Sequence, residues 1–255
     1  MEMIILNIFR GVPGQQYWEQ FDLELKPRYN VISALMEIQK NPVTIHGMPT
    51  TPVVWESGCL EEVCGSCSML INGIPRQACS AILNTIVRET GSPVVTLAPF
   101  TKFPLIRDLY VDRTMMFTHL KHLQAWVPVD GYYPAGSGPE VTQTQQEVMY
   151  RHSTCMTCGC CLEACPQVNS HSPFIGAAAI GQYRLFSIHP TARILQPERA
   201  RFLQERGGIA SCGNAQNCLR VCPKKIPLTD AIAAAGRDTT TQAIRDLLGL
   251  PERFH

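Results

Sequence analysis

The chain has 255 residues, a net charge of +1 and an ordinary apolar fraction. This length allows one or two domains that each bury a core. The near-neutral charge argues against nucleic-acid binding and against a polybasic membrane patch. The N-terminus carries no basic signal-peptide segment, and no apolar run approaches the roughly 20 residues that span a bilayer. We therefore expect a chain that is soluble by itself.

Twelve cysteines fall in three groups along the sequence. Their density is below that of a small secreted disulfide scaffold. Grouped cysteines favour metal sites over disulfide bridges. Thiols that stay free to bind metal indicate a reducing compartment.

The N-terminal third is predicted to form a small mixed sheet with a helix across it. Residues 4–9 are β-branched and apolar, and residues 21–25 alternate between apolar and polar. These patterns predict strands, and Asn30 is a suitable cap for a helix over residues 31–39. Residues 94–97 form the last predicted strand. Prolines follow it, so we place the domain boundary near Arg107.

Cys59, Cys64, Cys67 and Cys79 follow the spacing C-x4-C-x2-C…C. This is the plant-type [2Fe–2S] pattern. Gly58 and Gly65 allow the backbone to wrap closely around a cluster, with amides that can donate to sulfur. Asn72-Gly73 predicts a hairpin that brings Cys79 back toward the loop. Structural zinc is the alternative for such cysteines.

The C-terminal part is predicted to be helical. Apolar periodicity and end signals predict helices over residues 108–127, 142–152, 176–186, 198–206 and 230–250. Proline and glycine make residues 128–139 a loop.

Cys155, Cys158, Cys161, Cys165 and Pro166 spell C-x2-C-x2-C-x3-C-P. This run holds iron–sulfur clusters in bacterial ferredoxins, and its fourth cysteine ligates a second cluster. Zinc is again the alternative. Zinc needs four ligands, however, and five thiols fall within this short stretch.

The third group repeats the same run with one replacement. Cys212, Cys218 and Cys222 keep their places, and Ala215 stands where the second cysteine belongs. Exchange of the fourth cysteine between the runs predicts two ligand sets. A [4Fe–4S] site would use Cys155, Cys158, Cys161 and Cys222, and a three-thiolate site would use Cys165, Cys212 and Cys218. Because alanine cannot bind iron, we predict a [3Fe–4S] cluster in the second site; a [4Fe–4S] cluster with one open iron is the alternative.

Cys160 is the one cysteine left after four, four and three ligands are assigned. A buried cysteine beside a cluster is either a small apolar filler or a contact that tunes the cluster's potential. Three clusters of different types suit the transfer of single electrons. The sequence shows no Ser/His/Asp arrangement, phosphate loop or nucleotide fingerprint, so the donor's chemistry is expected on a partner.

Residues 59–67, 103–113 and 222–224 resemble the iron–sulfur subunit of succinate dehydrogenase/fumarate reductase (succinate:quinone oxidoreductase). The resemblance covers nearly the whole chain. Residues 165–170 and 184–190 are most similar to the Gram-positive type, which pairs with a single-chain dihaem cytochrome b and uses menaquinone.

The resemblance implies an α+β architecture. Residues 1–106 would be a plant-ferredoxin-like β-grasp domain with the [2Fe–2S] cluster. Residues 107–255 would be an all-α, bacterial-ferredoxin-like domain with the [4Fe–4S] and [3Fe–4S] clusters. Electrons from succinate would pass from covalent FAD on a flavoprotein subunit, through the three clusters, to menaquinone at a membrane anchor carrying haem b. The complex would be peripheral on the cytoplasmic side of the cell membrane.

The quinone site departs from the ubiquinone-type members. Those carry Trp residues after the Cys-Pro pair and a His after the first cysteine of the third group. Here Asn169, Ser170 and Gly213 stand in these places. Pro166 and Ala215 match quinone-contacting residues in position only. We therefore expect the anchor to supply most of the quinone contacts.

Two other functions stay open from the sequence. One is a free polyferredoxin carrier without a fixed partner, and the other is the iron–sulfur subunit of a non-succinate oxidoreductase such as heterodisulfide reductase or glycolate oxidase. Within the favoured family, the same residues would serve succinate oxidation or fumarate reduction.

Overall fold

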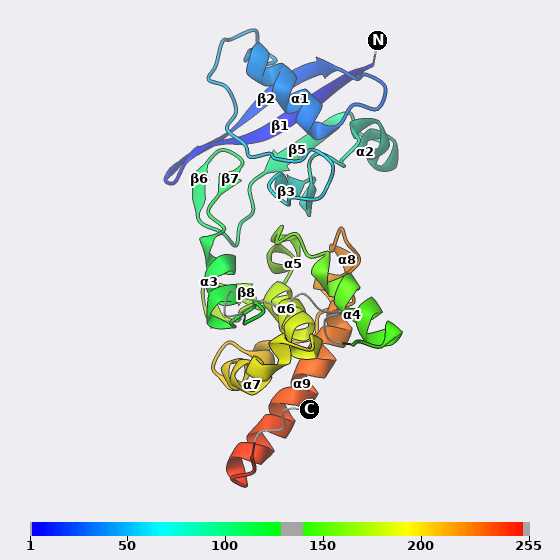
Figure 1. Ribbon diagram of the computed structural model, residues 1–255. Coiled ribbons are helices and arrows are strands. Elements are labelled where there is room, and N and C mark those ends of the chain that lie inside the picture. Colours follow the sequence, from blue (N-terminus) through cyan, green and yellow to red (C-terminus); the bar gives the residue numbers. More distant parts are fainter. Residues whose placement is uncertain (1, 129–139, 252–255) are drawn as a thin grey trace. The chain divides into compact units, whose positions relative to one another are not determined.

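The computed structural model describes residues 2–128 and 140–251, so most of the predicted loop 128–139 lies outside the described residues. The chain divides into two compact units. The first comprises Met1–Arg113 and Met156–Ala164, and the second comprises Thr114–Cys155 and Cys165–His255. These units differ from the predicted ranges 1–106 and 107–255 because a short segment of the first cysteine run packs with the N-terminal residues. Figure 1 shows the elements of each unit in chain order.

The first unit is built on a five-stranded mixed sheet with the order β2-β1-β5-β3-β4. Strand β1 pairs parallel with β5, and the other neighbours are antiparallel. The strands are β1 (Met3–Val12), β2 (Gln15–Glu24), β3 (Ser68–Ile71), β4 (Ile74–Gln77) and β5 (Val94–Ala98). The predicted mixed sheet and the Asn72-Gly73 hairpin are confirmed.

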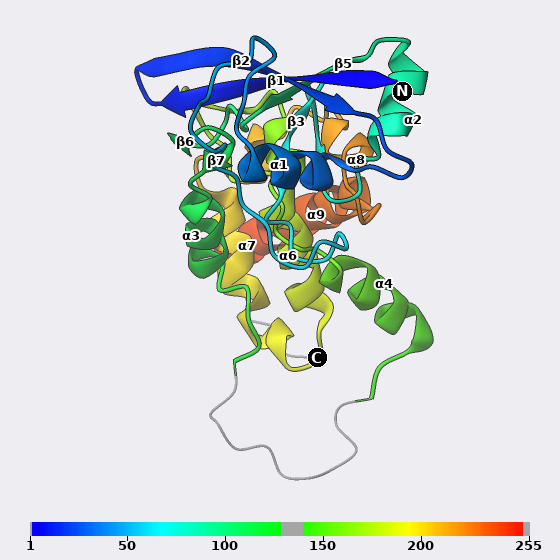
Figure 2. The same cartoon turned by 90° about the horizontal axis from the view of Figure 1, so that it is seen from above.

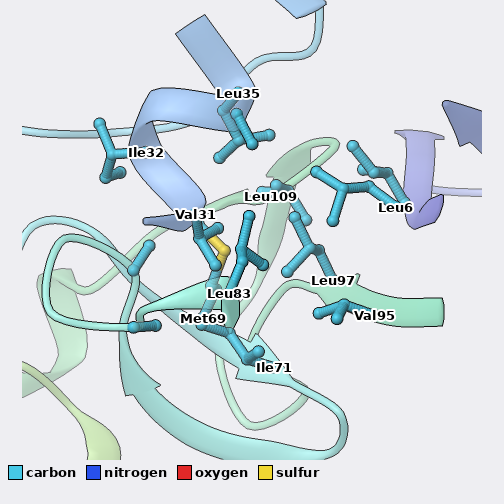
Figure 3. Packing of buried hydrophobic residues seen from close by; sticks show 14 of the residues in the cluster. Leu6, Val31, Ile32, Leu35, Met69, Ile71, Leu83, Val95, Leu97 and Leu109 are labelled. Atoms are coloured by element: carbon cyan, nitrogen blue, oxygen red, sulfur yellow. The ribbon is translucent and has the colours of Figure 1, made fainter. Parts of the chain in front are cut away.

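Helix α1 (Val31–Lys40) begins where the sequence predicted. The side chain of Asn30 caps it by accepting a hydrogen bond from the backbone N–H of Ser33 at 2.8 Å. Its apolar face packs against buried side chains of the sheet and of α2 (Leu83–Thr90), a helix that was not predicted (Figure 3). This core fixes the sheet on which the first cysteine loop is mounted.

The helix predicted over residues 108–127 is too long at both ends. Residues 105–111 form the hairpin of β6 (Leu105–Arg107) and β7 (Tyr110–Val111), and α3 spans Thr114–His122. Asp108 has a left-handed backbone, with φ at +49°. Its carboxylate accepts from the N–H groups of Gly11 and Val54 at 2.7 and 2.8 Å. These distant contacts override the local helical pattern.

The second unit is a group of helices around α6 (Ala177–Ile188), which contacts α3, α4, α7 and α9 (Figures 1 and 2). Small residues let these helices approach closely: a Cβ added at Gly181 would lie 3.1 Å from Leu228 Cδ2. The other main helices are α4 (Gln143–Ser153), α7 (Gln196–Gln204) and α9 (Leu228–Leu247). The short elements are β8 (Val168–Asn169), β9 (Ser172–Pro173), η1 (Ala192–Leu195) and η2 (Ile209–Ser211).

A buried arginine joins three parts of this unit. Arg199 is 1% exposed and donates to the backbone carbonyls of Gln124, Trp126, Phe186 and Ala192. Burial lowers the pKa of its guanidinium to about 10, although nearby Tyr183 and Glu198 oppose the shift. Carbonyl oxygens thus satisfy a charge that would otherwise be costly to bury.

Across residues 2–128 and 140–251, no helix combines the length and the apolar character needed to cross a membrane.

The carboxylate of Glu163 binds segment Met156–Ala164 to the rest of the first unit. Glu163 accepts hydrogen bonds from the Thr101 backbone N–H at 2.9 Å, the Thr101 hydroxyl at 2.7 Å and the Lys102 N–H at 3.0 Å. The Glu163 residue is buried, so water cannot replace these bonds.

We predict that Glu163→Gln destabilises the protein by about 1–3 kcal/mol, because the new NH₂ group would face N–H donors that it cannot satisfy. Denaturant unfolding of the cluster-loaded chain measures this. Glu147→Gln is the matched control, since Glu147 is exposed and its carboxylate accepts a hydrogen bond from the nearby Gln143. Equal unfolding midpoints for the two variants would show that Glu163 is not an anchor.

Candidate iron–sulfur sites

Backbone amides of the loop between Cys59 and Cys64 point at the sulfur atoms. Cys59 Sγ accepts from the N–H groups of Glu61, Val63 and Cys64 at 3.4, 3.2 and 3.2 Å. Left-handed φ values at residues 60, 62 and 65 fold the loop back on itself. Amides that surround sulfur in this way suit a ligand that carries negative charge.

The sulfur of Cys64 is also prepared to be a thiolate. It accepts from the N–H groups of Cys59 and Ser66 at 3.3 and 3.5 Å. Burial raises the pKa of Cys64, but these hydrogen bonds outweigh that effect and lower it to about 6. Thiolate is the form of cysteine that binds metal.

Cys67 and Cys79 lie at the open end of the β3–β4 hairpin. Ser68 pairs with Gln77 in the ladder, and Ala78 N–H donates to the Cys67 carbonyl at 3.0 Å. Burial raises the pKa of Cys67, and the neighbouring Cys79 sulfur raises it further, so the two sulfurs are close together. All four predicted [2Fe–2S] ligands therefore belong to one loop and hairpin of the first unit.

The two ferredoxin-like runs share one backbone conformation. In the first run, Thr157 and Gly159 have φ values of +52° and +87°. In the second run, Asn214 and Gln216 occupy the same positions and have φ values of +51° and +59°. Each run then enters a four-residue helix, α5 (Cys160–Glu163) or α8 (Asn217–Arg220). Ala215 therefore occupies the position of Cys158 in structure as well as in sequence.

Three thiols line one hollow in the second unit. These are Cys165, Cys212 and Cys218, and Ala215 lines the same hollow with Phe174 and Ile232. Burial raises the pKa of Cys218, and the charges of Cys165 and Cys212 add to the rise, which places the three sulfurs within electrostatic reach. The hollow thus offers three sulfur ligands and a methyl group at the fourth position.

The predicted four-thiolate set is divided between the units. Cys158 and Cys161 belong to the first unit, and Cys155 and Cys222 belong to the second. Cys222 Sγ accepts from the N–H of Ile226 at 3.5 Å. The grouping of these four sulfurs stays a prediction from their spacing.

No three His, Cys, Asp or Glu side chains of the described residues are arranged to hold a single metal ion. The ligands of a cluster are shared among two or more iron atoms, so as a set they stand farther apart than the ligands of one ion.

Sequence reasoning did not identify several polar residues beside the cysteines. Arg113 donates to the Gly65 carbonyl at 2.7 Å and to Glu56 at 2.8 Å. Gln77 is fully buried among sulfur and hydroxyl groups. Arg113 ends the phrase 103–113 that carried the family resemblance. For Gln77 the sequence offered no signal.

Gly65 is a point of close approach inside the first unit. Its φ is +74°, and a Cβ added there would lie 2.6 Å from the Met156 carbonyl oxygen and 2.9 Å from Cys158 Cα. Gly73 has nearly the same φ, +75°, but a Cβ added there would meet no atom within 4 Å. Substitution of Gly65 therefore adds steric crowding to backbone strain, whereas substitution of Gly73 causes backbone strain alone.

We predict that Gly65→Ala lowers the iron content per chain and that Gly73→Ala leaves it unchanged. Both variants bear the left-handed strain of about 1–2 kcal/mol, but only the first forces the two cysteine loops apart. Iron and acid-labile sulfide assays on the purified protein measure the difference. Equal iron contents would mean that this close approach is not required for cluster binding.

Two family models match the chain. A 2Fe-2S iron–sulfur cluster binding domain matches residues 5–118, and a 4Fe-4S dicluster domain matches residues 151–226. The first match contains the four cysteines of the loop and hairpin, and the second contains both ferredoxin-like runs.

Curated relatives match over almost the full length. The chain is 51% identical to the succinate dehydrogenase iron-sulfur subunit of Bacillus subtilis, over 91% of this chain and 90% of that protein. It is 26% identical to the fumarate reductase iron-sulfur subunit of Wolinella succinogenes, over 91% of this chain and 95% of that protein.

A solved structure shares the fold. A chain of the Mycobacterium smegmatis Sdh1 complex in the apo form superposes with a TM-score of 0.79 at 22% identity, covering 95% of this chain and 97% of that one. This match confirms the predicted ferredoxin-like fold class. With the 51% identity above, it follows that the chain belongs to the family of succinate dehydrogenase and fumarate reductase iron–sulfur subunits, the electron-transfer subunits of oxidoreductase complexes.

Proposed function

We propose that the chain carries single electrons from the FAD of a flavoprotein subunit toward menaquinone at a membrane anchor, as part of a succinate:quinone oxidoreductase. The observation that carries the proposal is the hollow lined by three thiols and Ala215 in the second unit. Such a site, beside two four-cysteine sets, matches a chain with three different clusters. Family membership supports the same role.

Eleven cysteines would bind the three iron–sulfur clusters. We assign Cys59, Cys64, Cys67 and Cys79 to [2Fe–2S]; Cys155, Cys158, Cys161 and Cys222 to [4Fe–4S]; and Cys165, Cys212 and Cys218 to [3Fe–4S]. Iron–sulfur clusters supply one-electron redox chemistry. The residues of this chain supply the thiolates, and the amides around Cys59 and Cys64 offset their negative charge.

The third set is better suited to [3Fe–4S] than to zinc or to a complete [4Fe–4S] cluster. Structural zinc sites take four protein ligands around one ion, and the thiols lining the hollow number three. A [4Fe–4S] cluster would leave one iron facing the methyl group of Ala215. A cluster with three irons needs no ligand at that corner.

Quinone contacts from this chain would be few. Pro166 and Ala215 line the hollow, but neither side chain donates a hydrogen bond. Asn169 uses its amide to donate to the Pro166 carbonyl at 2.9 Å. A Cβ on Gly213 would lie 2.7 Å from Nε2 at the end of the Gln167 side chain, so a side chain at position 213 would require Gln167 to move. We therefore propose that residues of the anchor hold most of the menaquinone.

The proposed partners are a flavoprotein with covalent FAD and a membrane-anchor cytochrome b with haem b. The complex would lie on the cytoplasmic side of the cell membrane and would be attached through its anchor. The reverse reaction, quinol-linked fumarate reduction, would use the same residues of this chain.

We predict that Ala215→Cys adds a fourth thiolate to the third site and converts it to a four-iron site. The added negative charge makes an electron there less favourable, so succinate-linked quinone reduction should fall several-fold. Succinate oxidation with a dye that accepts electrons at the flavoprotein should stay unchanged. Iron should rise by about one atom per chain.

Ala234→Cys is the matched control, because Ala234 is buried in α9 and does not line the hollow. It should leave iron content and both activities at wild-type values. If Ala215→Cys reduces quinone at the wild-type rate with unchanged iron, position 215 does not face the third cluster. If the wild-type complex does not couple succinate to quinone, the proposed function itself is wrong.

A further inference from the structure

The side chain of Gln77 contacts Cys67, a predicted cluster ligand, and Cys160, which lies next to the predicted ligand Cys161 in the sequence. Gln77 is the last residue of β4 and is 0% exposed. Its amide contacts three groups of the first unit. Nε2 lies 2.7 Å from Ser68 Oγ and 3.7 Å from Cys160 Sγ, and Oε1 lies 3.5 Å from Cys67 Sγ.

The hydroxyl of Ser68 fixes which end of this amide faces which sulfur. Ser68 Oγ donates its hydrogen to the Gly65 carbonyl at 2.6 Å, so only its lone pairs remain for Gln77. The group facing Ser68 must therefore be the NH₂ end of the amide, and Oε1 is held toward Cys67. The second hydrogen on Nε2 is directed at Cys160.

Cys160 links the Gln77 amide to the predicted ligand Cys158 through hydrogen bonds. Its thiol is 0% exposed and is hydrogen-bonded to the sulfur of Cys158. Gln77 Nε2 donates to Cys160. A Cys158 that holds iron is a thiolate without a hydrogen, so the donor between the two sulfurs is the Cys160 S–H. Cys160 is thus more than an apolar filler, because it connects Gln77 to Cys158.

The two ends of the amide act with opposite sign on the two sulfurs. A Cys67 that holds iron is a thiolate, and a carbonyl oxygen beside it disfavours further negative charge. The N–H end, acting through Cys160, favours negative charge at Cys158. Both effects are strong here because the groups are buried away from water. Hydrogen bonds and dipoles at ligand sulfurs are among the factors that set cluster potentials.

We infer that Gln77 is a positioning residue whose oriented amide lowers the reduction potential at the site held by Cys67 and raises it at the site held by Cys158. The amide therefore favours passage of an electron from the first site to the second. This inference rests on the cluster assignment of the proposed function.

The test is a redox titration of the purified complex, followed by electron paramagnetic resonance, for wild type and Gln77→Leu. Leucine has a similar volume but no dipole. We expect the potential of the Cys67 site to rise and that of the Cys158 site to fall. A looser or wetter structure would move both potentials in the same direction, so the opposite shifts distinguish an oriented amide from a packing defect.

Cys160 variants test the second step separately. Cys160→Ala should lower the potential of the Cys158 site alone, and Cys160→Ser, which keeps an O–H donor, should restore most of it. These variants decide the matter if Gln77→Leu fails to retain its clusters. Met69→Leu, a buried change in β3 without a polar group, is the packing control and should shift neither potential.

Unchanged potentials, or shifts of the same sign, in a Gln77→Leu complex with full iron would overturn the role of the amide. The electron-transfer function would then still stand, because the clusters would be present and reducible by succinate. A wild-type complex without these cluster signals would overturn both.

Discussion

The structure depends on one constraint: cysteines with only two to four residues between them must turn their sulfur atoms toward a common centre, which a regular strand, with side chains on alternating faces, does not do. The chain meets this constraint with left-handed residues. Thr157 and Gly159 turn the first run, and Asn214 and Gln216 turn the second in the same places. Non-glycine residues in this region cost about 1 kcal/mol or more each, so the surroundings must hold them. Glu163 does so for the first run through its bonds to Thr101 and Lys102.

The second requirement is electrostatic, because thiolates brought together repel one another. In the loop of Cys59 and Cys64, backbone N–H groups donate hydrogen bonds to the sulfur atoms and offset this repulsion. Arg113 holds the Gly65 carbonyl, and Ser68 donates to the same oxygen. These contacts also fix the amide of Gln77, so the geometry that shapes the loop orients a dipole between Cys67, a predicted ligand, and Cys160. Placement of the ligands and adjustment of their potentials are thus achieved by the same small group of residues.

The sequence predicted those features that depend on local pattern. Asn30 predicted the start of α1, and Asn72-Gly73 predicted the β3–β4 hairpin. Apolar, β-branched residues predicted β1, and alternation predicted β2. The sequence-based prediction was wrong where contacts with residues distant in the sequence determine the local structure. The helix expected from residue 108 begins at Thr114, because Asp108 is bound to Gly11 and Val54.

The candidate sites divide in the same way. Cysteine spacing predicted the ligand sets, and the place of Ala215 in the run predicted a missing ligand. The packing of residues 156–164 within the first unit depends on Glu163 and Gly65, whose partners lie 61 or more positions away in the sequence. Gln77 could not be found from sequence, since a glutamine at a strand end has no pattern that predicts a buried contact with sulfur.

The central claim is that Ala215 leaves the third site with three thiolates and therefore with three irons. The most direct measurement is the electron paramagnetic resonance spectrum of the oxidised, cluster-loaded wild-type chain, purified without exposure to air and without the haem-bearing anchor, because ferric haem would add its own signal. Oxidised [2Fe–2S] and [4Fe–4S] clusters are silent, whereas an oxidised [3Fe–4S] cluster gives a signal. We predict about one spin per chain, as one three-iron cluster requires. A silent spectrum from iron-replete protein would contradict the three-thiolate assignment.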